Sequence, residues 1–142
     1  MATHTDQKLE LLKGTPLLAG LGRKDIEEVG RLVDEVDLRA GYVLMREGDI
    51  GREFFVIIDG QVRIDKGGST IRTIGPGDFL GSIALVTEGP RTATATTETP
   101  CRLLVLNHGA FHQLMDQYPS IRLAVFEAMA KQIRALDTEA VH

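Results

Sequence analysis

The sequence predicts an α+β fold in which an antiparallel β jelly roll or barrel of about eight strands is flanked by N-terminal helices and a C-terminal helix. Turn signals recur between residues 36 and 106 at the spacing typical of antiparallel sandwiches. Helical periodicity replaces these signals on both sides of that zone. Because 142 residues is an ordinary length for one domain, we expect a single domain over residues 1–142.

The N-terminal helical zone covers residues 6–35. Gly14 and Pro16 divide it into short helices, since neither residue favours a helix interior. In the stretch GRKDIEEVGRLVDEV, which begins at Gly22, the apolar residues recur at helical spacing and share one face. These residues are Ile26, Val29, Leu32 and Val33.

The strand zone covers residues 36–106. The dipeptide Asp59-Gly60 predicts a type I′ hairpin between the runs on either side of it, because this turn needs positive φ at its two central positions. Alternating small and hydroxylic residues predict a further strand with one face in a crowded interior. The runs that we expect to form strands are YVLMR (42–46), EFFVII (53–58), QVRID (61–65), TIRTI (70–74), TATATTET (92–99) and CRLLVL (101–106).

The C-terminal helical zone covers residues 107–138. Asn107 is a candidate N-cap for a first helix, which ends at Pro119. The second helix carries an apolar stripe that must be covered by the domain, a ligand or a partner helix. The stripe consists of Ile121, Val125, Met129, Ile133 and Leu136.

The charge pattern argues against a nucleic-acid surface. The formal net charge is −4, and the basic residues are scattered singly along the chain. The first residues lack the pattern of a secretory signal, and no apolar run approaches the roughly 20 residues of a membrane helix. Cys101 is the only cysteine, which fits a reducing compartment. We therefore expect a cytoplasmic protein that binds neither nucleic acid nor membrane.

The sequence does not predict a catalytic or metal site. Ser82 lacks a G-x-S-x-G elbow, and Cys101 is expected to be a buried strand residue with no base beside it. His108 and His112 are spaced i, i+4, but no third ligand has supporting spacing. A cupin enzyme would need histidines on the strands, where this chain has none. We predict that the chain is not an enzyme and holds no metal or cofactor.

The segment GSIALVTEGPRTA, residues 81–93, predicts a pocket for an anion. A helical turn begun at Ile83 would point the free N–H groups of Ile83, Ala84 and Leu85 toward a bound anion. Arg91 adds a permanent cation whose planar fork suits two phosphate oxygens. The small side chains of Ala84 and Ala93 allow close approach. The segment is therefore interpreted as a phosphate cradle without the Walker pattern.

These residues resemble the phosphate-binding cassette of the cyclic nucleotide-binding domain family, whose members include CRP and the regulatory subunits of protein kinase A. The blocks EGDIGREFFVIIDGQVRI and IRTIGPGDFLG are also similar to strand–turn blocks of that family, and the likeness covers residues 10–136. The cassette positions that match are Gly81, Ile83, Ala84, Leu85, Pro90, Arg91, Thr92 and Ala93.

The resemblance implies a sensor that binds cAMP or cGMP and transmits binding through its C-terminal helix. Arg91 and the N–H groups of Ala84 and Leu85 would hold the cyclic phosphate. Gly81 would meet the ribose through its carbonyl oxygen. Thr92 would lie near the phosphate and the base edge, where threonine is compatible with guanine and does not exclude adenine.

The resemblance leaves two roles open for the C-terminal helix. Around Val125, Phe126 and Met129, the helix would form a lid over the base or the seam of a homodimer. The signal would pass to a second copy of the chain or to an effector protein.

One cassette position departs from the family pattern. The family has a glutamate that accepts a hydrogen bond from the ribose 2′-hydroxyl, where this chain has Ser82. Loss of that bond implies binding weaker by about 10- to 150-fold. Alternatively, Ser82 is an N-cap, or it marks a degenerate domain that serves as a dimerisation or interaction scaffold without binding nucleotide. In an empty pocket, Glu53 and Glu88 are the candidate ion partners of Arg91.

Overall fold

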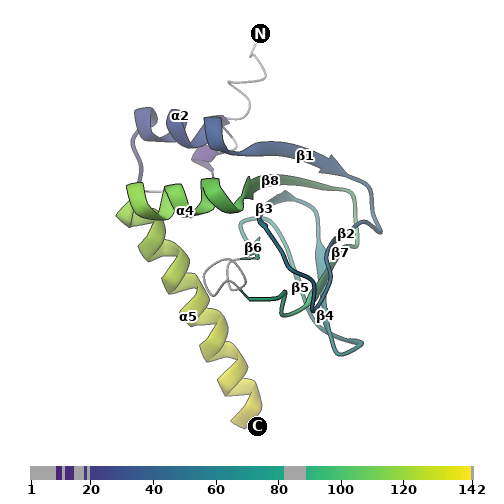
Figure 1. The fold of residues 1–142 in the computed structure, drawn as a ribbon. Helices are drawn as coiled ribbons and strands as arrows, with labels where there is room; N and C mark the ends of the chain where they lie inside the picture. The colour runs from purple at the N-terminus through teal and green to yellow at the C-terminus, as the bar shows by residue number, and fades with distance from the viewer. Residues whose placement is uncertain (1–8, 11, 15–17, 19, 82–88, 142) are drawn as a thin grey trace.

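The computed structural model describes residues 9–10, 12–14, 18, 20–81 and 89–141, and it contains two four-stranded antiparallel sheets with helices at one end (Figure 1). The N-terminal helix α2 spans Arg23–Leu32. The first four strands are β1 (Asp34–Leu38), β2 (Val43–Met45), β3 (Glu53–Asp59) and β4 (Val62–Lys66). They are followed by β5 (Ser69–Ile74), β6 (Phe79–Leu80), β7 (Thr94–Thr97), β8 (Cys101–Asn107), α4 (His108–Gln117) and α5 (Pro119–Val141).

The two sheets confirm the predicted jelly roll, although they do not close into a barrel. One sheet has the strand order β1-β8-β3-β6, and the other has the order β2-β7-β4-β5. All strand pairs within the described residues are antiparallel. Consecutive strands often lie in different sheets, so that the chain passes repeatedly from one sheet to the other.

The predicted hairpin at Asp59-Gly60 is wrong. β3 pairs with β8 and β6, whereas β4 pairs with β7 and β5, so the turn between β3 and β4 leads from one sheet to the other. Gly60 does have the positive φ that the dipeptide predicts, +99°. The observed hairpin joins β4 to β5 through Gly67 and Gly68, whose φ angles are +59° and +81°. The dipeptide therefore identified the turn but not the partner strand.

β3 is buried on both faces, which explains why its sequence is a continuous apolar run. Phe54 and Val56 face the helices and belong to one core cluster. Phe55 and Ile57 face the interior of the roll and belong to a second cluster. Because successive side chains of a strand point to opposite faces, β3 stabilises two cores at once.

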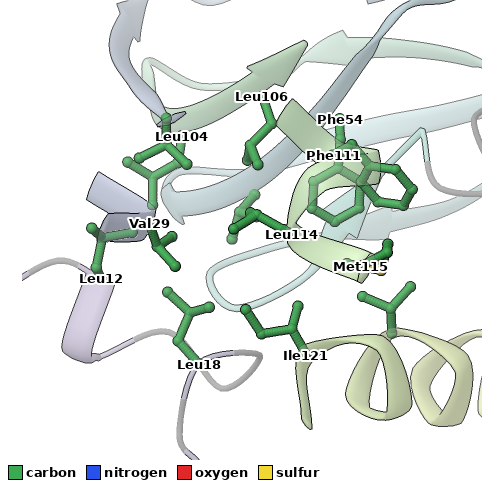
Figure 2. Close-up of a pocket in the computed structure, with 13 residues that line it drawn as sticks. Leu12, Leu18, Val29, Phe54, Leu104, Leu106, Phe111, Leu114, Met115 and Ile121 are labelled. Carbon is green, nitrogen blue, oxygen red and sulfur yellow. The ribbon is translucent and has the colours of Figure 1, made fainter. Parts of the chain in front are cut away.

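The helix-facing core joins α2, α4 and α5 to the sheet. The ring of Phe54 packs on the rings of Phe79 and Phe111, with centroids 5.4 and 5.0 Å apart. A small cavity of about 30 Å³ remains in this core, and apolar side chains alone line it. Figure 2 shows Phe54, Phe111, Leu114 and other residues pointing into it. This lining offers a water molecule no polar partner.

The start of the sheet lies earlier than the sequence predicts. Asp34 and Glu35, which the predicted helical zone includes, are in β1 and pair with Val105 and Leu104 of β8. α2 ends at Leu32, one turn short of the prediction. The pairing with β8 outweighs the weak helical signal here, since a strand paired along its whole length gains ladder hydrogen bonds and cross-strand side-chain contacts.

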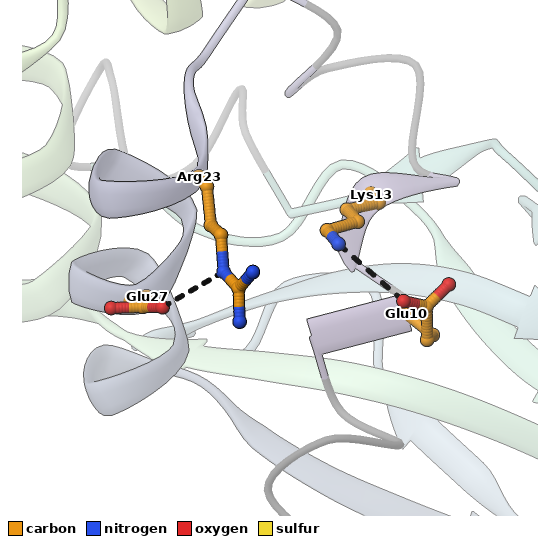
Figure 3. A network of polar contacts seen from close by, with 4 residues as sticks. All are labelled: Glu10, Lys13, Arg23 and Glu27. Atoms are coloured by element: carbon orange, nitrogen blue, oxygen red, sulfur yellow. Dashed lines mark hydrogen bonds and ion pairs between the residues drawn. The ribbon is translucent and has the colours of Figure 1, made fainter.

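The N-terminal ion pairs lie on the surface and contribute little to stability. Arg23 Nε and Glu27 Oε1 are 3.3 Å apart on α2, and Lys13 Nζ and Glu10 Oε1 are 3.4 Å apart (Figure 3). Exposed pairs of this kind are worth about 0.2–1 kcal/mol. The buried residues Ile26 and Val29 hold α2 in place instead.

The C-terminal helices confirm two predictions. Asn107 caps α4, because its Oδ1 accepts a hydrogen bond from the N–H of Ala110 at 2.8 Å. The apolar stripe of α5 faces the core at Ile121 and Val125, which are 3% and 1% exposed, and Met129 packs partly against it. The structure does not describe the side chains of Ile133 and Leu136, so their place on the stripe stays a prediction. No helix in the described part of the chain is long and apolar enough to cross a membrane.

A hydrogen bond ties α2 to the joint between α4 and α5. The hydroxyl of Tyr118, which lies between these two helices, donates to Glu28 Oε2. This bond to a carboxylate raises the pKa of Tyr118 to about 12, from the ordinary value of 10.0. Between pH 10 and about 12, the phenol of Tyr118 loses its proton in the unfolded state but keeps it in the folded state. The folded state then binds more protons, and stability falls as the pH rises.

We therefore expect Tyr118→Phe to be less stable than the wild type at pH 8. We expect the difference to shrink as the pH rises from about 10 toward 12, because the wild type loses the stabilisation that the variant never had. Urea unfolding midpoints at pH 8, 10 and 11 measure this difference. Tyr42→Phe is the matched control, since Tyr42 is the other tyrosine and is 45% exposed. A Tyr118→Phe deficit that stays constant up to pH 11 would contradict the assignment.

Candidate functional site

Arg91 lies where two loops are joined by backbone hydrogen bonds. The N–H of Arg91 donates to the carbonyl oxygen of Asp49 at 2.8 Å, and the N–H of Gly48 donates to the carbonyl oxygen of Arg91 at 2.9 Å. Ile50 and Pro90 form an isolated antiparallel bridge beside these bonds. Arg91 therefore sits on a fixed backbone, although it belongs to no regular strand.

The guanidinium of Arg91 is buried in a cradle made by two glycines. Arg91 is 4% exposed. A Cβ on Gly51 would lie 1.7 Å from its Nε, and a Cβ on Gly81 would lie 2.6 Å from its Nη1. Gly81 also has a φ of +93°, a backbone conformation that residues with a Cβ atom rarely adopt. Both positions thus need glycine to let the side chain enter.

Two backbone carbonyl groups orient the guanidinium. Nη2 donates to the carbonyl oxygen of Glu53 at 2.8 Å, and Nη1 makes a long contact of 3.5 Å with the carbonyl oxygen of Gly81. The guanidinium carbon lies 5.9 Å from the ring centroid of Phe55. Arginine carries five N–H donors, so three of them have no hydrogen-bond acceptor within the described residues.

Within the described residues, one carboxylate, that of Glu53, lies in ion-pair range of the positive charge of Arg91. Burial lowers the pKa of the Arg91 guanidinium, and the Glu53 carboxylate raises it against that effect. Glu53 Oε2 lies 3.9 Å from Nη2, and the Glu53 side chain is half exposed. Burying a charge without full compensation costs several kcal/mol. An anion with several acceptor oxygens would suit the donors of Arg91 that have no acceptor within the described residues.

The structure describes five of the nine predicted site residues. Gly81 and Arg91 are in contact, and Ala93 is buried in the roll at 6% exposure. Thr92 and Pro90 are exposed next to Arg91 along the chain. The remaining residues lie outside the described residues, and their roles stay predictions: Ser82, Ile83, Ala84 and Leu85.

The pairing of Glu53 with Arg91 was predicted from charge. The packing of the guanidinium between Gly51 and Gly81 was not predicted. Glu88, the other candidate partner, lies outside the described residues. Gly51 was not identified, and the backbone carbonyl of Glu53 leaves no sequence signal, because every residue has one. The one sequence signal that could have identified Gly51 is its place in EGDIGREFFVII, two residues before β3.

The other candidate groups lie away from Arg91. The rings of His108 and His112 are neighbours on α4, with centroids 4.4 Å apart, and Nε2 of His112 is buried without a hydrogen bond. Among the described residues, no three His, Cys, Asp or Glu side chains gather to hold a metal ion. Cys101 is a buried strand residue, as predicted, and its Sγ contacts the carbonyl oxygen of Thr99 at 3.3 Å.

The fit of Arg91 against Gly51 can be tested with a double-mutant cycle. We expect Gly51→Ala to destabilise the wild type by about 1–3 kcal/mol, because the new methyl group overlaps the guanidinium. In an Arg91→Ala background the same change should cost much less, since the overlapping atoms are gone. Urea denaturation of the four proteins gives the coupling energy. Equal losses in both backgrounds would show that Gly51 does not seat Arg91.

Comparison with known proteins gives a consistent family assignment. The family model described as the cyclic nucleotide-binding domain matches residues 35–118. The cAMP-dependent protein kinase regulatory subunit of Schizosaccharomyces pombe is 31% identical over 106 residues, which cover 74% of this chain and 26% of that protein. The CRP-like cAMP-activated global transcriptional regulator of Mycobacterium tuberculosis is 28% identical over 130 residues, which cover 88% of this chain and 58% of that protein.

A solved structure is similar to this chain over nearly its whole length. The N-terminal domain of a transcriptional regulator from Streptomyces coelicolor A3(2) has 30% sequence identity and a TM-score of 0.67, and the match covers 91% of this chain and 93% of that one. This chain spans about a quarter to somewhat more than half of the length of the curated relatives above. Because the family model matches more than half of the chain, the chain belongs to the cyclic nucleotide-binding domain family.

Proposed function

We propose that this chain is a regulatory module that binds a cyclic nucleotide, cAMP or cGMP, at the Arg91 cradle and catalyses no reaction. The observation that carries the proposal is the buried guanidinium, three of whose donors are unused within the described residues. A cyclic phosphate has one negative charge and two free oxygens, and the arginine fork can engage both. The cAMP in the names of both curated relatives makes cAMP the first ligand to test.

The predicted cassette supplies the remaining contacts of the proposed site. The N–H groups of Ala84 and Leu85 would complete the cradle around the phosphate. Gly81 would accept from the ribose through its carbonyl oxygen, and Thr92, which is exposed, would stand near the base edge. No metal or further cofactor is needed, because the ligand is bound and released unchanged.

α5 is the element that would carry the signal. Its first turns are anchored in the core by Ile121 and Val125, whereas Leu123 and Phe126 are 58% and 46% exposed on another face. That exposed face would cover the base or pair with a second copy or an effector protein in the cytoplasm. A ligand moves such a helix only if it binds two arrangements with different affinity. We place the site and the helix in one domain over residues 1–142.

Titration with nucleotide tests the role of Arg91. We expect saturable binding of cAMP or cGMP by nucleotide-stripped wild type in calorimetry. Arg91→Lys should bind about 10- to 150-fold more weakly, because it keeps the charge but loses the two-pronged hydrogen bond. Arg91→Ala should bind no measurable nucleotide, and circular dichroism checks that both variants are folded. Unchanged heats in Arg91→Ala would place the site elsewhere, and no wild-type binding at millimolar nucleotide would overturn the proposal.

A second titration tests the cassette position that departs from the family pattern. We expect Ser82→Glu to raise the affinity by about 10- to 150-fold, since a carboxylate there can accept a hydrogen bond from the ribose 2′-hydroxyl. The gain should vanish when the 2′-deoxy form of the same nucleotide is used, because the donor is then missing. A gain of equal size for the deoxy nucleotide would contradict a contact between residue 82 and the ribose.

A further inference from the structure

Glu53 places a carboxylate beside the cation that the proposed ligand would use. It is the first residue of β3, and strand alternation puts its side chain on the same face as Phe55, next to the Arg91 guanidinium. The Glu53 Oε2 atom lies 3.9 Å from Arg91 Nη2. Within the described residues, it is the one carboxylate in ion-pair range of Arg91.

The Glu53 carboxylate places a negative charge near Arg91 but does not orient the guanidinium. A separation of 3.9 Å is too long for a hydrogen bond, so the side chain of Glu53 does not orient the guanidinium. The backbone carbonyl oxygen of Glu53 does that already, at 2.8 Å from Nη2. The side chain is also half exposed, and it can therefore turn toward water without moving β3.

We propose that the Glu53 carboxylate is an anionic placeholder, which neutralises Arg91 in the empty cradle and opposes the phosphate that replaces it. The inference rests on the proposed function. A phosphate bound to the donors of Arg91 that have no acceptor within the described residues would stand within a few ångströms of Glu53, and two like charges at that distance repel. Binding then requires Glu53 to rotate outward. Glu53 thereby weakens the affinity for the ligand while it stabilises the ligand-free protein.

Removing only the charge of Glu53 tests the placeholder. Glu53→Gln has nearly the same shape, and the backbone carbonyl bond to Arg91 is kept. We expect cAMP and cGMP to bind this variant about threefold to tenfold more tightly than the wild type in calorimetry at low salt. We also expect the ligand-free variant to melt at a lower temperature than the ligand-free wild type, since Arg91 loses its counter-charge. Opposite changes in affinity and in ligand-free stability are the signature of a placeholder.

Glu98→Gln is the matched control for the change in net charge. Glu98 is exposed after β7, and within the described residues its side chain makes no hydrogen bond or ion pair. The affinity of Glu98→Gln for cAMP and cGMP should stay within about twofold of that of the wild type. Equal or weaker binding by Glu53→Gln, with the wild type binding, would overturn the placeholder and leave the proposed function standing. No binding by any of the three proteins would overturn the proposed function, and the placeholder with it.

Discussion

The burial of one guanidinium is the constraint on which the site depends. Arg91 can enter the protein only because two chain segments approach it without side chains, one at Gly51 and one at Gly81. The pairing of β6 with β3 brings Gly81 next to the start of β3, and the bridge between Ile50 and Pro90 fixes the loop that carries Gly51. The two-sheet topology is thus what converts three separate stretches of sequence into one cradle.

β3 links this cradle to the helices through consecutive residues. The carbonyl oxygen of Glu53 holds the guanidinium, and Phe55 lies beneath it. Phe54, between them in sequence, points to the opposite face and packs on Phe111 of α4. The start of β3 therefore packs against the guanidinium on one face and against the helix layer on the other.

Local signals in the sequence predicted more of the structure than long-range pairing did. The cap at Asn107, the strand at Cys101 and the buried stripe at Ile121 and Val125 follow from nearest-neighbour patterns, and the structure confirms them. Strand partners depend on residues far apart in the chain, which is why the Asp59-Gly60 turn was assigned to the wrong pairing. β6 is two residues long, too short for any periodicity to be read. Arg91 could be predicted because it belongs to a sequence motif. The backbone carbonyl groups that orient it could not, because every residue has one.

The cradle also connects ligand binding with stability. Under the proposed function, an anion bound at Arg91 would compensate the buried cation and so stabilise the folded state. Anything that binds only the folded state stabilises it, by about 2.7 kcal/mol at a ligand concentration of 100 times Kd. In the proposed arrangement Glu53, 3.9 Å from Arg91, would oppose this coupling, because it would compensate the guanidinium before the ligand arrives. On this proposal, the balance between the Glu53 carboxylate and the phosphate of the ligand would set both the stability of the ligand-free domain and its affinity for the nucleotide.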